Sequence, residues 1–137
     1  MKILIVDDSR LLRIATERTL VRAGYEVITA ADGEEGLRLA LESNPDLVVL
    51  DMMLPRLSGQ EVLRRLRTNS SSASTPVIVL TSLSESNREK LLSEGASLYF
   101  EKSLLRLENG SGPLLDAIET LLARRPKAKA AASPASS

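Results

Sequence analysis

The sequence predicts a doubly wound α/β domain, in which helices cover both faces of a five-stranded parallel sheet. Two patterns support this prediction. Short apolar runs alternate along the chain with longer stretches that carry apolar residues at helical spacing. Most of the short runs are apolar at nearly every position, which is typical of parallel strands buried on both faces. The 137 residues are enough for one domain with its own hydrophobic core.

Five segments are predicted to form the strands. The first spans residues 2–6 (KILIV), the third 47–50 (LVVL) and the fourth 77–80 (VIVL). The second, at 25–30 (YEVITA), alternates between apolar and polar residues, and the fifth spans 96–100.

The first two helices are bounded by capping and breaking residues. The first is expected to follow Asp8 and Ser9, which can cap it, and to end at Gly24. The second follows a turn at Asp32 and Gly33 and stops before the next proline. Their inward-facing residues are expected to be Leu11, Leu12, Ala15 and Leu20 in the first helix, and Gly36, Leu37, Ala40 and Leu41 in the second.

Three more helices are expected. Ser58 and Glu61 form a capping-box pattern at the start of the third, and a polar loop follows it at residues 68–75. The fourth spans roughly residues 85–94, and Pro113 suits the first position of the last one. Their inward-facing residues are expected to be Val62, Leu63 and Leu66 in the third helix, and Leu114, Leu115, Ile118, Leu121 and Leu122 in the last.

Composition excludes several kinds of chemistry and partner. The chain has no cysteine and no histidine, which excludes disulfides, thiolate nucleophiles and Ser-His-Asp triads. Its 18 basic and 18 acidic residues balance and aromatic residues are few, so we do not expect it to bind nucleic acid. No apolar run approaches the roughly 20 residues of a membrane span, and the N-terminus does not resemble a signal peptide. We therefore expect a cytoplasmic protein that does not bind membranes.

The composition changes near the C-terminus. From Arg125 the sequence reads RPKAKAAASPASS, which offers nothing to bury. We expect residues 1–124 to form the domain and residues 125–137 to be a disordered tail or the beginning of a linker.

Polar residues follow four of the five predicted strands. Asp7 and Asp8 follow the first, Asp51 the third, Thr81 the fourth and Lys102 the fifth. In a flavodoxin-like strand order of 2-1-3-4-5, the carboxyl ends of these strands would bring the side chains to one edge of the sheet. Three carboxylates at one edge repel each other, and a hard divalent cation such as Mg²⁺ would relieve that repulsion.

Four motifs in this order make the chain resemble the receiver domain of bacterial response regulators, which act in two-component and phosphorelay signalling. They are ILIVDDS at 3–9, LVVLDMMLPRLSG at 47–59, PVIVLTS at 76–82 and GASLYFEK at 95–102. The resemblance covers essentially all of residues 1–124. It implies a signalling phosphoacceptor that catalyses only its own phosphorylation and dephosphorylation, rather than an enzyme with other substrates.

The resemblance also implies roles for individual residues. Asp51 would accept the phosphoryl group, and Lys102 would contact it. Asp8 would bind Mg²⁺ directly and Asp7 largely through water, while Asp51 and the backbone carbonyl of Met53 would complete the metal ligands.

A phosphorylation-dependent switch follows from the same resemblance. Thr81 would move toward the phosphoryl group, and the aromatic ring of Tyr99 would fill the space that Thr81 leaves. The face formed by the fourth helix, the fifth strand and the last helix would then change shape for a protein partner.

The expected partners follow from this switch. They are a histidine kinase or histidine phosphotransfer protein as donor, and a downstream protein as target. The sequence leaves open whether phosphorylation drives formation of a homodimer.

The chain departs from the family pattern after Lys102. Ser103 stands where the family usually has proline, often after a cis peptide, so we expect a trans bond or a remodelled loop here. Residues 103–112 are expected to form a longer loop than usual, whose leucines either tuck under the last helix or form part of a contact surface. These leucines are Leu104, Leu105 and Leu107. Met53 and Leu83 are apolar at positions where polar residues help to position water, so we expect slow loss of the phosphoryl group.

Three functions other than that of a phosphorylated receiver can be compared with the sequence. A receiver-fold scaffold that binds proteins without phosphorylation is compatible with Ser103 and the long loop. A flavin- or nucleotide-binding protein would need glycine and hydroxyl residues after the first strand, where two carboxylates stand instead. A metal-dependent phosphatase would carry its acidic residues two apart there, and Asp7 and Asp8 are adjacent.

Overall fold

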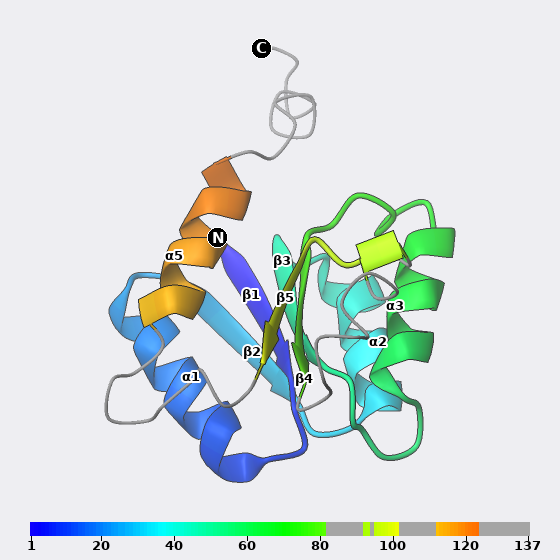
Figure 1. Ribbon diagram of the computed structural model, residues 1–137, viewed down its shortest axis with the longest axis horizontal. Helices are drawn as coiled ribbons and strands as arrows, with labels where there is room; N and C mark the ends of the chain where they lie inside the picture. Colours follow the sequence, from blue (N-terminus) through cyan, green and yellow to red (C-terminus); the bar gives the residue numbers. More distant parts are fainter. Residues whose placement is uncertain (82–91, 94, 102–111, 124–137) are drawn as a thin grey trace.

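Five parallel strands form the centre of the molecule, in the order β2-β1-β3-β4-β5 (Figure 1). The computed structural model describes residues 1–81, 92–93, 95–101 and 112–123. The order confirms the doubly wound arrangement that the apolar runs predicted. The strands are β1 (Lys2–Val6), β2 (Glu26–Ala30), β3 (Leu47–Asp51), β4 (Val77–Thr81) and β5 (Leu98–Glu101).

Helices pack on both faces of this sheet. Figure 1 shows α1 and α5 on one face, and α2 and α3 on the other. The helix expected over residues 85–94 lies outside the described residues, except for residues 92 and 93, which are both helical. The bounds of the labelled helices are α1 (Arg10–Arg22), α2 (Gly33–Ser43), α3 (Gly59–Thr68) and α5 (Gly112–Ala123).

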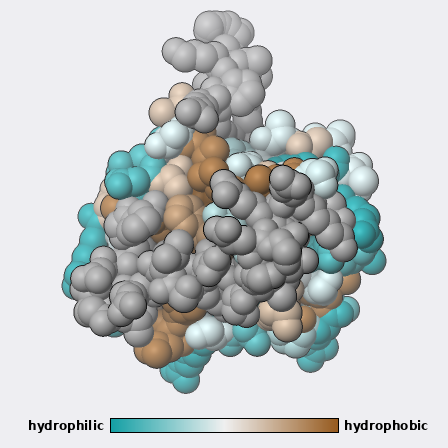
Figure 2. All heavy atoms as spheres, viewed as in Figure 1, coloured by the Kyte–Doolittle hydropathy of each residue, from teal (hydrophilic) through white to brown (hydrophobic). Residues whose placement is uncertain are grey.

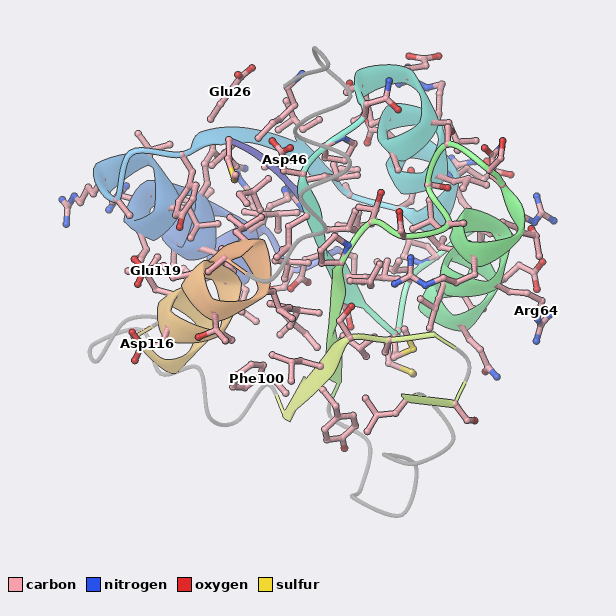
Figure 3. All side chains as sticks on the ribbon, turned by 90° about the horizontal axis from the view of Figure 1, so that it is seen from above. Glu26, Asp46, Arg64, Phe100, Asp116 and Glu119 are labelled. Carbon is pink, nitrogen blue, oxygen red and sulfur yellow. The ribbon has the colours of Figure 1, made fainter. Side chains whose placement is uncertain are left out.

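The alternating side chains of β1 show how the sheet supports two apolar layers. Leu4 and Val6 pack with residues of α2 and α3, whereas Ile3 and Ile5 pack with residues of α1 and α5. All four have exposed fractions of 0–1%. Figure 3 shows Phe100 on the α5 side of β5, where it packs against the same layer as Ile3. A strand buried on both faces must be apolar throughout, which is the pattern seen in the sequence.

Three helices begin at the carboxyl edge of the sheet, each with a side-chain cap. Ser9 Oγ accepts from Leu12 N at 3.3 Å, Asp32 Oδ1 from Glu35 N at 2.8 Å, and Ser58 Oγ from Glu61 N at 3.2 Å. These bonds satisfy backbone donors that the first turn of a helix leaves without partners. The carboxylate of Glu61 binds the side chains of Arg64 and Arg65.

The inward-facing residues expected from the sequence are buried or partly buried with one exception, where the prediction is wrong. Leu11 of α1 is 66% exposed, whereas Thr16 and Leu20 are buried. The helix packs through the row that joins Leu12, Thr16 and Leu20 at four-residue spacing, and Leu11 lies about 100° away from that row.

Several element boundaries also differ from the prediction. Asp32 and Gly33 were expected to form a turn, but Asp32 caps α2 and Gly33 is its first residue. The strand β2 begins one residue later than expected, and β5 covers Leu98–Glu101 instead of 96–100. The helix α3 runs on through Thr68, which was expected to begin the loop.

Arg67 joins three segments at the opposite edge of the sheet. Its guanidinium donates to the carbonyl oxygens of Gly95, Thr75 and Ser72 at 2.9, 2.7 and 3.2 Å. Because the group is partly buried there, desolvation lowers the pKa of Arg67 below its usual value. The end of α3 is thereby tied to the residues that lead into β4 and β5.

The outer faces of the helices are mostly polar, with an apolar stretch on α1. Figure 2 shows hydrophilic residues along the side formed by α2 and α3, and hydrophobic residues over one end of α1. The exposed apolar residues of α1 are Leu11, Ile14 and Val21. Within the described part of the chain, no helix is long and apolar enough to cross a membrane.

The two apolar layers predict how truncations will affect stability. Leu66→Ala removes a side chain of 0% exposure from α3, so we expect unfolding free energy to fall by about 2–5 kcal/mol. The matched change Leu11→Ala, at a position 66% exposed, should change it by less than about 0.5 kcal/mol. Urea unfolding followed by circular dichroism measures both, and equal losses would contradict the assignment of the core.

Candidate functional site

An acidic cluster lies at the carboxyl edge of the sheet. The strands β1 and β3 are neighbours, and Val6 pairs with Leu50, so the residues that follow them are brought together. These are Asp7 and Asp51, and Asp8 joins them from the start of the next loop. One carboxylate oxygen from each of the three lies within 4.8 Å of the others. The grouping expected from the strand ends is therefore present for these three residues.

Short-range hydrogen bonds hold the two buried carboxylates. Asp7 and Asp51 each have an exposed fraction of 1%, whereas Asp8 is exposed. Asp7 Oδ1 accepts from the backbone nitrogen of Ser9 at 2.9 Å, and Asp51 Oδ1 accepts from that of Met53 at 3.1 Å. Both bonds span two residues, as in an Asx turn. The side chains are fixed by the loops that directly follow their strands.

The charges of the cluster suit a hard divalent cation. Three carboxylates this close repel one another, and burial of two of them strengthens the repulsion. Magnesium prefers oxygen ligands at about 2.1 Å, so oxygens bound to one ion lie at most about 4.2 Å apart. A mutual separation within 4.8 Å is close to that limit, and every donor is oxygen. The residues present therefore fit Mg²⁺.

The structure also places Met53 and Tyr99. Met53 follows the acidic strand end, its backbone nitrogen bonds Asp51, and its side chain is 60% exposed. Tyr99 lies in β5 opposite Val79 and is partly buried against the apolar layer beneath α2 and α3.

Only the backbone of Thr81 can be placed. It ends β4 and pairs with Glu101 of β5, and its neighbour Leu80 pairs with Asp51. Thr81 is thus at the same edge as the acidic cluster. Its side chain lies outside the described residues, as do Leu83, Lys102, Ser103, the long loop and the C-terminal tail.

Two glycines beside the site were not identified from the sequence. A Cβ at Gly59 would lie 2.1 Å from the carbonyl oxygen of Asp51, and a Cβ at Gly33 would lie 1.7 Å from that of Leu57. Each glycine is the first residue of a helix, directly after its cap. Glycine is a poor helix former, so a glycine at the first position of a helix can indicate that the backbone of another segment lies close to it. Arg56, which bridges to Asp32 at 3.6 Å, gave no such signal.

Comparison with known proteins identifies the family. The family model described as response regulator receiver domain matches residues 3–108. Among curated relatives, the alkaline phosphatase synthesis transcriptional regulatory protein PhoP of Bacillus subtilis is 44% identical over 102 residues, which are 74% of this chain and 42% of that protein. Response regulator MprA of Mycobacterium leprae is 42% identical over 138 residues, covering 100% of this chain and 58% of that protein. The chain spans about half the length of these relatives.

Solved structures agree in fold. The receiver domain of the Francisella response regulator 1452 superposes with a TM-score of 0.81 at 29% identity, covering 91% of this chain and 98% of that one. The chemotaxis protein CheY4 of Vibrio cholerae gives a TM-score of 0.76 at 32% identity, covering 87% and 96%. The match to the family model extends from β1 beyond β5 and includes the whole acidic cluster, and this chain belongs to the family of response regulator receiver domains.

Proposed function

We propose that this chain accepts a phosphoryl group on Asp51 from a phosphohistidine of a histidine kinase or histidine phosphotransfer protein, in a Mg²⁺-dependent reaction. The observation that carries the proposal is the burial of Asp51 beside Asp7 and within reach of Asp8. An oxygen of Asp51 would attack phosphorus, and the phosphorus–nitrogen bond of the donor would break with its electron pair going to nitrogen. A proton carried by the donor's imidazole ring would make the leaving group a neutral histidine. The chain itself has no histidine and acts only as acceptor.

The residues of the cluster would divide the work. Asp8 and Asp7, with Asp51 and the backbone carbonyl of Met53, would hold Mg²⁺. Bound there, the ion supplies positive charge that offsets the carboxylates and the phosphoryl oxygens. The hydrogen bond from Met53 N to Asp51 Oδ1, at 3.1 Å, orients the acceptor carboxylate. Lys102 follows the last residue of β5 and would contact the phosphoryl group.

Phosphorylation would then change a protein-binding face. Thr81 ends β4, the strand that pairs with β3 next to Asp51, and Tyr99 lies in β5 on the other side of β4. A hydroxyl of Thr81 that moves toward the new phosphoryl oxygens would therefore alter the space beside the ring of Tyr99. The face would comprise the segment at 85–94, β5 and α5, and a downstream protein would bind it. The proposal retains the cytoplasmic location, the domain at 1–124 and the tail at 125–137 expected from the sequence.

A scaffold that binds proteins without phosphorylation is the second candidate. Ser103 and the longer loop at 103–112 favour it, because they change the sequence next to Lys102. The cluster of Asp7, Asp8 and Asp51 favours the receiver, because a scaffold gains nothing from three mutually repelling carboxylates.

Mass spectrometry of the intact protein tests the proposed function. After incubation with acetyl phosphate and Mg²⁺, we expect a gain of one phosphoryl group, which requires the metal and is lost in Asp51→Ala. The exposed residue Asp116 of α5 gives the control, and Asp116→Ala should react as wild type does. A folded protein that accepts no phosphoryl group, from acetyl phosphate or from a phosphorylated phosphotransfer protein, would support the scaffold instead.

The repulsion within the cluster predicts an effect on stability. With a chelator present to remove metal ions, and at low salt, Asp8→Asn should raise the free energy of unfolding by about 1 kcal/mol. The reason is that one of three neighbouring negative charges is removed. Mg²⁺ should raise the melting temperature of wild type and have a much smaller effect on this variant. Asp116→Asn on α5 (Figure 3) should respond to Mg²⁺ as wild type does. A wild type whose melting temperature ignores Mg²⁺ would contradict a metal site here.

The exposed side chain of Met53 predicts a long-lived aspartyl-phosphate. A polar group at this position could hold water near the phosphoryl group, so Met53→Asn should shorten the lifetime several-fold. Release of inorganic phosphate from the phosphorylated protein measures the lifetime. Leu11→Asn, at an exposed position on α1, is the control. An unchanged lifetime in Met53→Asn would show that this side chain does not limit hydrolysis.

A further inference from the structure

Arg56 has an unusual backbone conformation for its residue type. It lies in the loop that joins β3 to α3, at residues 52–58, and its φ is +71°. Among the described residues, Asn44 is the other non-glycine residue with positive φ, and it ends α2 as an αL cap. Asparagine tolerates this region because its short side chain bonds locally, and arginine has no such advantage. The backbone conformation does not favour arginine at position 56, so we attribute the arginine to contacts made by its side chain.

That side chain reaches the beginning of α2. Its Nε lies 3.6 Å from Asp32 Oδ2, and its Nη1 lies 3.9 Å from Glu34 Oε1. The other oxygen of Asp32 accepts from Glu35 N at 2.8 Å and caps the helix. Asp32 therefore serves two segments at once, with one oxygen for the helix and the other facing the loop.

Backbone contacts on either side of Arg56 bring the same two segments together. Gly33 N donates to the carbonyl oxygen of Pro55 at 3.2 Å. A Cβ at Gly33 would lie 1.7 Å from the carbonyl oxygen of Leu57, so the loop backbone lies directly against the first turn of α2. The ion pairs of Arg56 close this contact from the solvent side, where the side chain is 66% exposed.

The same loop begins at the proposed acceptor. Met53 N donates to Asp51 Oδ1 at 3.1 Å, and Gly59 N donates to the carbonyl oxygen of Met52 at 3.1 Å. The loop is thus bonded to the last residue of β3 at its start, closed by the bond between Gly59 and Met52, and held against α2 at its middle. The position of the Met53 carbonyl between these attachments depends on all of them.

We infer that Arg56 is a positioning residue for the metal site: it holds the loop at residues 52–58 against α2 and so fixes the backbone at Met53. This inference rests on the proposed function, since the carbonyl of Met53 matters only where the cluster binds Mg²⁺. The sign of the effect separates positioning from simple electrostatics. Removing a nearby positive charge would strengthen cation binding, whereas releasing the loop weakens it.

Calorimetric titration with Mg²⁺ tests this in the full chain. Arg56→Gln should bind Mg²⁺ about two- to fivefold more weakly than wild type, a modest effect because the ion pairs are exposed. Arg56→Lys keeps the charge and should recover most of the affinity. Arg64→Gln makes the same change on the outer face of α3, where Figure 3 shows Arg64 pointing away from the sheet, and should bind as wild type does.

A metal-independent readout and a partner variant complete the test. Without Mg²⁺, hydrogen exchange at residues 53–57 should be faster in Arg56→Gln than in wild type, and unchanged in Arg64→Gln. Asp32→Asn keeps the helix cap but loses the charge, so combining it with Arg56→Gln should weaken binding no further than either change alone.

The outcomes distinguish the two proposals. Equal or tighter Mg²⁺ binding by Arg56→Gln, or unchanged exchange in the loop, would overturn the positioning role while leaving the proposed function intact. A wild-type protein that binds no Mg²⁺ would overturn the metal site of the proposed function, and the role of Arg56 with it.

Discussion

The parallel pairing of β1 with β3 is the constraint on which the site depends. Because Val6 lies opposite Leu50, Asp7 and Asp51 leave the sheet side by side, each with only 1% of its surface exposed. A shift of register between the two strands would separate the carboxylates. The apolar residues that hold the two strands in register therefore also determine the distance between the carboxylates of Asp7 and Asp51.

The helices that begin at this edge extend the same constraint to the loops. A glycine starts α2 and another starts α3, and in both cases a Cβ would collide with a backbone carbonyl of the segment from Asp51 to Leu57. This segment is consequently enclosed between two helix starts and a strand end. The contacts of Pro55 with Gly33 and of Arg56 with Asp32 connect this segment to α2.

The acidic cluster at the carboxyl edge acts against the stability of the fold. Three carboxylates within 4.8 Å of one another cost stability, and two apolar layers packed on β1 offset that cost. Because the cluster lowers the stability of the fold, it is better explained by binding a ligand than by a contribution to folding. Its location beyond the strand ends is where parallel sheets commonly bind ligands.

The sequence by itself predicted the strands and the acidic residues of the site, because buried parallel strands are continuously apolar and their carboxyl ends share one edge. The strand order was taken from flavodoxin-like folds, and the structure confirms it. The sequence did not determine which side of α1 packs, so Leu11 was wrongly placed in the core. It also gave no indication of Arg56, whose partners lie more than 20 residues away in the chain. Helix rotation and loop contacts depend on residues distant in sequence, and only the tertiary structure brings those together.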